Sequence, residues 1–213
     1  MDILYQDNRI IVCLKPAGVL STDEPGGLPD LIRDYLGEEK SCVRTVHRLD
    51  RVVGGVMVLA RSREAARRLS AQVRDRSFEK NYLALVHGSP EQEEGTFRDL
   101  LLRCKEEKKT YVTDRPGKEA QEAILRYRVL DRREGLSLIR IHLETGRTHQ
   151  IRAQFSSRDL PLVGDKKYGA PAREMDGIAL WSHSVAFRHP QTEEKLRFES
   201  DPPRRDPWTI FFP

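Results

Sequence analysis

The chain has 213 residues, of which 38% are hydrophobic and 33% charged, and its formal net charge is +4. Such a composition is typical of a globular protein with a highly charged surface. No run approaches 18 consecutive apolar residues, so the sequence predicts no membrane-spanning helix.

The N-terminal region predicts two short strands, a loop and a helix. Residues 3–5 and 10–14 have the composition of strands, and "QDN" between them favours a turn. Residues 15–27, "KPAGVLSTDEPGG", are rich in proline and glycine and predict a long loop. Residues 28–37 predict a short helix, with a proline near its first turn and a glycine past its end.

A buried strand, a helix and a second strand are expected next. Residues 56–60 are wholly apolar, which is typical of a buried strand. In residues 62–76, Ser62 can cap a helix whose apolar side chains share one face. Residues 80–88, "KNYLALVHG", predict a strand with a polar start.

The second half of the chain predicts mostly antiparallel strands. Residues 89–120 are highly charged and favour hairpins and exposed loops. Residues 123–131 and 136–145 alternate between apolar and polar side chains, which indicates a hairpin.

Towards the C-terminus, residues 147–157 favour a helix and residues 160–169 a loop. Residues 178–190 predict a strand that pairs with residues 195–200. The fold class is therefore expected to be α+β, with a mostly antiparallel sheet and few flanking helices, in a single domain over residues 1–213.

The N-terminus and the cysteines favour a cytoplasmic protein. The first sixteen residues, "MDILYQDNRIIVCLKP", carry an acid at position 2 and no basic segment, so no secretory signal is expected. Cys13, Cys42 and Cys104 are odd in number and scattered, which argues against a disulfide framework and offers no zinc-binding CxxC pair. We therefore expect buried free thiols in a reducing compartment.

Arginine is concentrated in one part of the chain. Residues 44–76 contain nine arginines and three acidic residues. A local excess of this kind is typical of a surface that binds phosphates, although a solvated helix face explains residues 63–76 equally well.

Asp50 is the leading candidate for chemistry. It lies in "HRLDR", directly before an apolar run, where a carboxylate is costly to bury unless it is paired. Arg48 and Arg51 are its sequence neighbours, and Arg147 is a more distant partner. Such pairing would keep Asp50 ionised, as a nucleophile or a general base requires, whereas an ordinary ion pair at the start of a strand is the structural alternative.

Other catalytic chemistries lack their motifs. The six histidines fit no HExxH pattern, and no GxSxG serine motif, P-loop or GxGxxG fingerprint follows a strand. The residues alone therefore indicate neither a metal nor a nucleotide cofactor.

Six segments, in order, resemble the RluA-like pseudouridine synthases over nearly the whole chain. "ILYQDNRIIVCLKPAGVL" is similar to the opening strands and "NKPAG" loop of that family, and "VHRLDRVVGGVMVLARS" to its "HRLDxxTSGLLLLAK" motif. "KNYLALVHG" resembles "KxYxAxVxG", "LETGRTHQIRAQFSS" resembles "LxTGRTHQIRVHL", and "LPLVGDKKYG" resembles "PIxGDxxYG". "LWSHSVAFRHPQTEEKLRFES" resembles the closing block "LHAxxLxFxHP".

The resemblance implies roles for individual residues. The catalytic aspartate of the family falls on Asp50 and its active-site tyrosine on Tyr82. Its basic partner to the aspartate falls on Arg147, with Arg152 as the second choice. Arg48 corresponds to the arginine that can fill the gap left by an extruded base.

The resemblance also implies the reaction, the isomerisation of uridine to pseudouridine in RNA without a metal or organic cofactor. Two routes for Asp50 stay open, attack on the base or sugar and removal of the ribose 2′ proton to give a glycal. The target uridine would be turned out of its stack, with Tyr82 beneath it, in a central RNA-binding cleft. The residues expected to bind RNA are Arg48, Arg51, Arg67, Arg68, Arg152, Lys166 and Lys167.

One departure from the family pattern concerns the residues after Asp50. Where the family has "TSG", this chain has Val53, Gly54 and Gly55. The loss of two hydroxyl groups is expected to alter the rate or the substrate, because none of the residues with an implied catalytic role is changed.

Two rival functions are also compatible with these residues. An inactive RNA-binding protein of the same fold would need only the basic surface, and a glycosidase that also uses a carboxylate would release free uracil. Because the chain begins at the first expected strand, no S4 domain is expected. The substrate is then expected to be structured RNA, an rRNA or tRNA stem-loop, with no membrane and no obligate protein partner.

Overall fold

The computed structural model describes residues 2–171 and 177–213. Its contacts divide the chain into two compact units, which are described separately. The first unit comprises Met1–Lys80 and Ser182–Asp201, and the second comprises Asn81–Trp181 and Pro202–Pro213. The chain thus leaves the first unit within one strand and returns to it within another. The predicted single domain over residues 1–213 stays a prediction.

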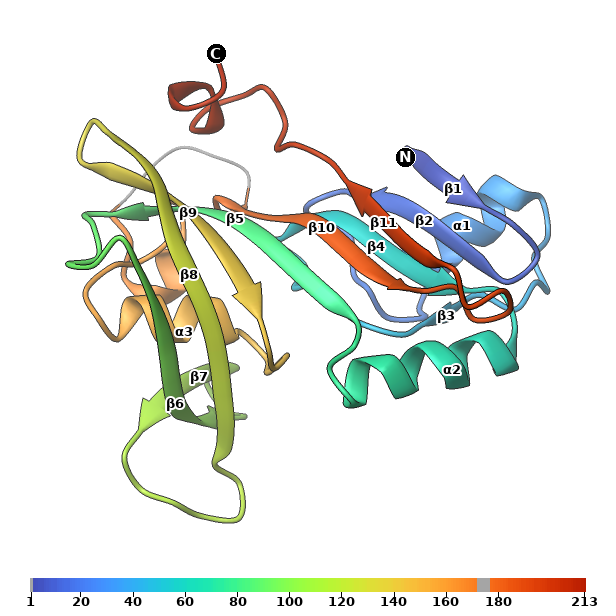
Figure 1. Ribbon diagram of the computed structural model, residues 1–213, viewed down its shortest axis with the longest axis horizontal. Coiled ribbons are helices and arrows are strands. Elements are labelled where there is room, and N and C mark those ends of the chain that lie inside the picture. The colour runs from blue at the N-terminus through green and yellow to red at the C-terminus, as the bar shows by residue number, and fades with distance from the viewer. Residues whose placement is uncertain (1, 172–176) are drawn as a thin grey trace. The chain divides into compact units, whose positions relative to one another are not determined.

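The first unit is built on a sheet. Its strands β1 (Ile3–Gln6), β2 (Ile10–Lys15), β4 (Gly54–Ala60) and β10 (Leu180–Arg188) are neighbours in that order, and β11 (Lys195–Glu199) also pairs with β10 (Figure 1). The pairs β1–β2, β2–β4 and β10–β11 are antiparallel. The short strand β3 (Arg44–Thr45) also pairs with β4. Every residue of β4 is buried, which explains why this strand is apolar throughout.

Two helices complete the first unit. Helix α2 (Arg63–Arg74) begins at Ser62, whose hydroxyl accepts a hydrogen bond from the backbone N–H of Ala65, as predicted for the cap. Its Leu69 packs into a core formed with residues of β2, β4 and β10. Helix α1 (Leu28–Leu36) ends at Gly37 in the left-handed conformation, as its sequence predicts.

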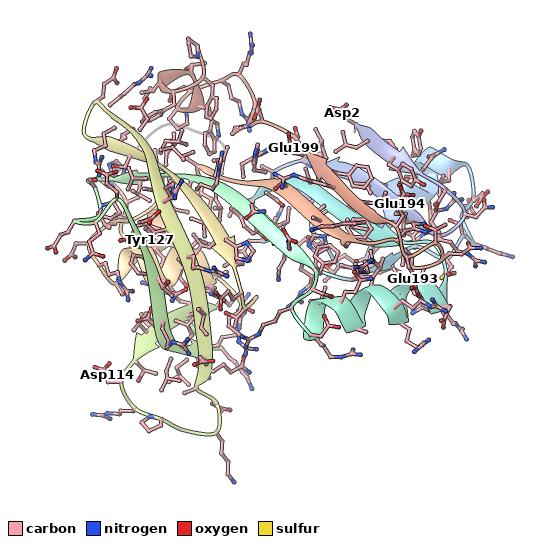
Figure 2. The ribbon with its side chains drawn as sticks, in the orientation of Figure 1. Asp2, Asp114, Tyr127, Glu193, Glu194 and Glu199 are labelled. Atoms are coloured by element: carbon pink, nitrogen blue, oxygen red, sulfur yellow. The ribbon has the colours of Figure 1, made fainter. Side chains whose placement is uncertain are left out.

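The second unit is built on five strands. Their order is β5 (Glu79–His87), β9 (Leu136–Leu143), β8 (Gln121–Arg133), β6 (Glu94–Cys104) and β7 (Lys109–Thr113), and these neighbours pair antiparallel. Helix α3 (Gln150–Ser156) and two 3₁₀ helices, Lys166–Tyr168 and Trp208–Ile210, accompany them. Tyr127 of β8, labelled in Figure 2, packs with Phe97 and Phe155 in the interior.

The α+β class is therefore confirmed, with most of the elements expected from the sequence. The main differences are at element ends. The helix predicted over residues 147–157 begins only at Gln150, because residues 145–149 form a turn, and the strand predicted from Val56 begins at Gly54. Within the described residues, no helix is long and apolar enough to cross a membrane.

Candidate active site

Asp50 lies in a turn of the first unit directly before the buried strand β4. Its side chain is half-buried, between the buried Leu49 and the exposed Arg51. The carbonyl oxygen of Asp50 accepts a hydrogen bond of 3.0 Å from the backbone N–H of Val53, which closes the turn. The carboxylate is thus carried by a short, hydrogen-bonded turn on a rigid strand, where its position is well defined.

The residue before Asp50 is held by Ser21. The hydroxyl of Ser21, which is 3% exposed, donates a hydrogen bond of 2.8 Å to the carbonyl oxygen of Leu49 and lies 3.2 Å from the backbone nitrogen of Leu49. The carbonyl oxygen of Ser21 accepts a further bond from the hydroxyl of Thr45. This pair of contacts fixes the backbone of Leu49.

The residue after Asp50 is held by the same loop. The backbone N–H of Gly18 donates to the carbonyl oxygen of Arg51 at 2.7 Å, and Nε of Arg51 donates to the carbonyl oxygen of Gly18 at 2.9 Å. We refer to residues 16–21 as the clamp loop, because they bind the backbone on both sides of Asp50.

The side chain of Lys15 holds the clamp loop through hydrogen bonds to backbone carbonyl oxygens. Its side chain is fully buried, and Nζ lies 2.8 Å from the carbonyl oxygen of Pro16, 2.7 Å from that of Val19 and 3.4 Å from that of Arg51. Burial lowers the pKa of Lys15 to about 8, and the charge of Asp50 opposes this change. An ammonium group therefore lies within electrostatic reach of the candidate carboxylate.

His47 has a structural place in the same segment. Its Nε2 accepts a hydrogen bond from the backbone N–H of Val58, and its ring lies 5.1 Å from that of Phe78. Burial, with the charge of Lys80, lowers the pKa of His47 to about 3. A histidine held neutral in the core helps to fix β4 and is not available as a general acid.

Gly55 matches the glycine of the expected "TSG" and follows Val53 and Gly54, where the chain departs from that motif. Its φ is +121°, and an added Cβ would lie 2.3 Å from the carbonyl oxygen of Ser182 on β10. Only glycine fits this close approach between β4 and β10.

Tyr82 belongs to the second unit, on β5. It is 5% exposed and pairs in register with Ile141 of β9. The strand therefore fixes the position of its Cα and leaves the ring largely shielded from solvent.

Arg147 lies in the turn before α3 and is exposed. Its Nε donates to the carbonyl oxygen of Glu122 at 2.9 Å, and its backbone N–H donates to Oε1 of Gln150. The buried Gln150 also receives the hydroxyl proton of Thr145 and donates Nε2–H to the carbonyl oxygen of Ile124. The turn is therefore fixed from the interior while the guanidinium reaches the surface.

Arg152 differs from Arg147 in burial and in partner. It is 6% exposed, and its Nε and Nη2 donate to the two carboxylate oxygens of Asp165 at 2.6 and 2.8 Å. Its guanidinium also lies 5.0 Å from the ring centroid of Tyr168. A bidentate pair with both partners buried is rigid and strongly oriented.

The other residues expected to bind RNA are all exposed. Among residues 2–171 and 177–213, Arg48 makes no ion pair. Arg67 and Arg68 of α2 both donate to Glu64, and Lys167 donates to the carbonyl oxygens of Glu107 and Lys108.

The structure thus places Asp50, Arg48 and Arg51 in the first unit and Tyr82, Arg147 and Arg152 in the second. Lys15, Ser21 and Gln150 were not among the residues expected from the sequence. A lysine within an otherwise apolar strand was the one available signal for Lys15. Within the described part of the chain, no group of three or more His, Cys, Asp or Glu side chains is placed to hold a metal ion.

The chain is similar to several known proteins. Residues 9–157 match the family model described as RNA pseudouridylate synthase. The chain is 32% identical to "Uncharacterized RNA pseudouridine synthase YlyB" of Bacillus subtilis, over 95% of this chain and 69% of that protein. It is 33% identical to "Dual-specificity RNA pseudouridine synthase RluA" of Yersinia pestis, over 94% of this chain and 98% of that protein. The solved structure "Human RNA Pseudouridylate Synthase Domain Containing 4" aligns with a TM-score of 0.78 at 25% identity, over 95% of this chain and 89% of that one.

Proposed function

Because this chain belongs to the RNA pseudouridylate synthase family, we propose that Asp50 is the catalytic carboxylate with which it isomerises specific uridines in structured RNA. The chain is an RluA-type pseudouridine synthase, an RNA uridine isomerase. The reaction breaks the C–N bond between uracil and ribose and forms a C–C bond from the same base to the same sugar carbon. The proton on the carbon that forms the new bond leaves to solvent, and the ring nitrogen released from the sugar takes up a proton, so substrate and product are isomers.

One observation carries the proposal for Asp50. Its carboxylate is half-buried on a turn whose flanking residues, Leu49 and Arg51, are both held by the clamp loop. Chemistry that must release and recapture a base needs a carboxylate at a fixed position. Both routes, direct attack and formation of a glycal, use the ionised form of the carboxylate, whose charge interacts with the buried ammonium of Lys15.

We propose Tyr82 and Arg147 as the other catalytic residues. Tyr82, whose place on β5 is rigid and shielded, would stack against the extruded base, a contact worth roughly 1–3 kcal/mol. Arg147 would orient the aspartate, as the sequence suggests. The buried Arg152 is the second choice for that role, and its tight pair with Asp165 supports a structural part as well.

The RNA itself would be bound by exposed basic side chains. Arg48 makes no ion pair among the residues that the structure describes, which leaves its charge available for a phosphate or for the gap of an extruded base. The remaining contacts are proposed for Arg51, Arg67, Arg68, Lys166 and Lys167, and they would give salt-dependent affinity.

We further propose that the substrate is an rRNA or a tRNA and that the enzyme acts in the cytoplasm, without a cofactor or an obligate protein partner. The three free cysteines fit a reducing compartment, although only Cys13 is buried and Cys42 and Cys104 are partly exposed, unlike the expected buried thiols. Relatives that carry the name "dual-specificity" are a reason to test both RNA classes together.

The experiment uses unmodified rRNA and tRNA transcripts labelled with tritium at uracil C5. Wild-type protein is expected to release tritium to water and to leave pseudouridine at discrete positions. The alternative, an inactive RNA-binding protein, predicts binding without tritium release from any transcript. Free uracil in the supernatant would instead indicate a glycosidase.

A further inference from the structure

Resting on the proposed role of Asp50, we propose that Lys15 and Ser21 are positioning residues of the reaction, which together fix the backbone on both sides of Asp50 and place a buried positive charge near its carboxylate. Neither residue needs to touch the RNA. Both act through Asp50, and both lie with it in the first unit.

The contacts of Lys15 explain how one side chain serves both purposes. Its protons are directed at the carbonyl oxygens of Pro16, Val19 and Arg51, so the ammonium ties the clamp loop to the residue after Asp50. The ammonium is held by these neutral carbonyl oxygens and interacts with Asp50 through its charge. Lys15 therefore acts on the carboxylate through its charge, while its protons are taken up by backbone oxygens.

The burial of Lys15 requires an anion nearby. A fully buried ammonium is costly unless its charge is compensated. The titratable groups whose charges act on Lys15 are Asp50, from the turn, and Cys13, from the same strand β2. Burial raises the pKa of Cys13 to about 12, so its thiol is neutral at ordinary pH. Asp50 is the compensating anion.

Ser21 fixes the position of the backbone next to Asp50 and adds no charge. Its buried hydroxyl bonds the carbonyl oxygen and the backbone nitrogen of Leu49, at the opposite side of Asp50 from the contacts of Lys15. Loss of the hydroxyl would free one end of the turn while leaving every charge in place. Comparing variants of Lys15 and Ser21 therefore separates the effect of the position of Asp50 from the effect of the nearby positive charge.

The test measures single-turnover tritium release, RNA affinity and thermal stability for Lys15→Met and Ser21→Ala. Lys15→Met is expected to slow the chemical step roughly 10²-fold and Ser21→Ala about tenfold, with RNA affinity within threefold of wild type. Ser182→Ala is the matched control, because its buried hydroxyl donates one 2.9 Å hydrogen bond to the carbonyl oxygen of Val56. It is expected to lose stability without a comparable loss of rate.

A pH profile distinguishes a positioned charge from a structural contact. Lys15 loses its proton as pH rises through about 8, so the wild-type rate is expected to fall between pH 7.5 and 9. Lys15→Met should lack this fall, and Ser21→Ala should keep it. Lys15→Arg, whose charge persists, should hold its rate to pH 9.

The outcomes separate this inference from the proposed function. If Asp50→Asn is inactive but Ser21→Ala matches Ser182→Ala and the alkaline fall is absent, the inference is wrong and the function stands. If wild type makes no pseudouridine at all, the proposed function itself fails. Should Lys15→Met not fold, Ser21→Ala and the wild-type profile still decide the matter.

Discussion

The backbone N–H of Val58 donates a 3.1 Å hydrogen bond to Nε2 of His47, so the imidazole serves as an acceptor inside the first unit. A protonated ring could not accept this bond, and burial further opposes the charge. The pKa of His47 is accordingly lowered to about 3. The histidine of "HRLD" thus supports β4 by staying neutral.

Acid is therefore expected to weaken the fold through His47. Between its unfolded pKa of about 6.5 and its folded pKa of about 3, the unfolded chain binds the extra proton, so the free energy of unfolding falls as pH falls. The slope from this one group is up to about 1.4 kcal/mol per pH unit. Urea titrations of wild type and His47→Gln from pH 7 to 4 measure it. Parallel curves for the two proteins would show that His47 does not contribute.

Gly55→Ala is expected to destabilise the protein severely. An alanine Cβ would meet the backbone of Ser182 at 2.3 Å, in addition to the strain of φ +121°. We expect a loss of more than about 3 kcal/mol by urea denaturation. The control is Gly37→Ala, at φ +66° with nothing within 4 Å, which should cost only about 1–2 kcal/mol. Equal losses would mean that the close approach of β4 and β10 does not matter.

Breaking the buried ion pair of Arg152 and Asp165 should lower the free energy of unfolding far more than breaking a surface ion pair. Asp165→Ala leaves a buried guanidinium without its bidentate partner, which is expected to cost about 3–5 kcal/mol of unfolding free energy. Glu122→Ala, which breaks the exposed pair with Arg98, serves as the control and should change stability by less than about 1 kcal/mol. A loss of under 1 kcal/mol for both variants would contradict the importance given to burial.

The basic face of α2 should affect RNA affinity and its salt dependence. Replacing Arg67 and Arg68 together by glutamine is expected to weaken RNA binding and to reduce the slope of log affinity against log salt by about 1–2. Replacing Arg98 and Arg128 of the second unit, which are likewise exposed and paired with glutamates, provides the matched comparison. Identical slopes in the two double variants would place the RNA elsewhere than on α2.

Much of the fold could be predicted from local patterns. The cap of α2 by Ser62, the left-handed Gly37 after α1 and the hairpin of β8 and β9 follow from short-range chemistry. The turn before α3 was missed because it depends on Gln150, which bonds Thr145 and Ile124 in the interior. Nothing in the local sequence reveals such tertiary bonds.

The candidate site was predictable only in part. Asp50 was noticeable as a charge beside an apolar strand, and its half-buried place fits that expectation. The clamp loop was not predictable, because Ser21 lies 28 residues from Leu49 and Lys15 lies 36 residues from Arg51. A proline- and glycine-rich segment suggests a loop, but it does not say which backbone the loop holds.

The most direct measurement is the single-turnover rate of tritium release by Asp50→Asn, a change that removes the charge and keeps the shape. If Asp50 performs the chemistry, the rate should fall at least about 10³-fold while RNA affinity stays within threefold of wild type. A variant that binds RNA normally and keeps more than a tenth of the wild-type rate would show that another group isomerises the uridine.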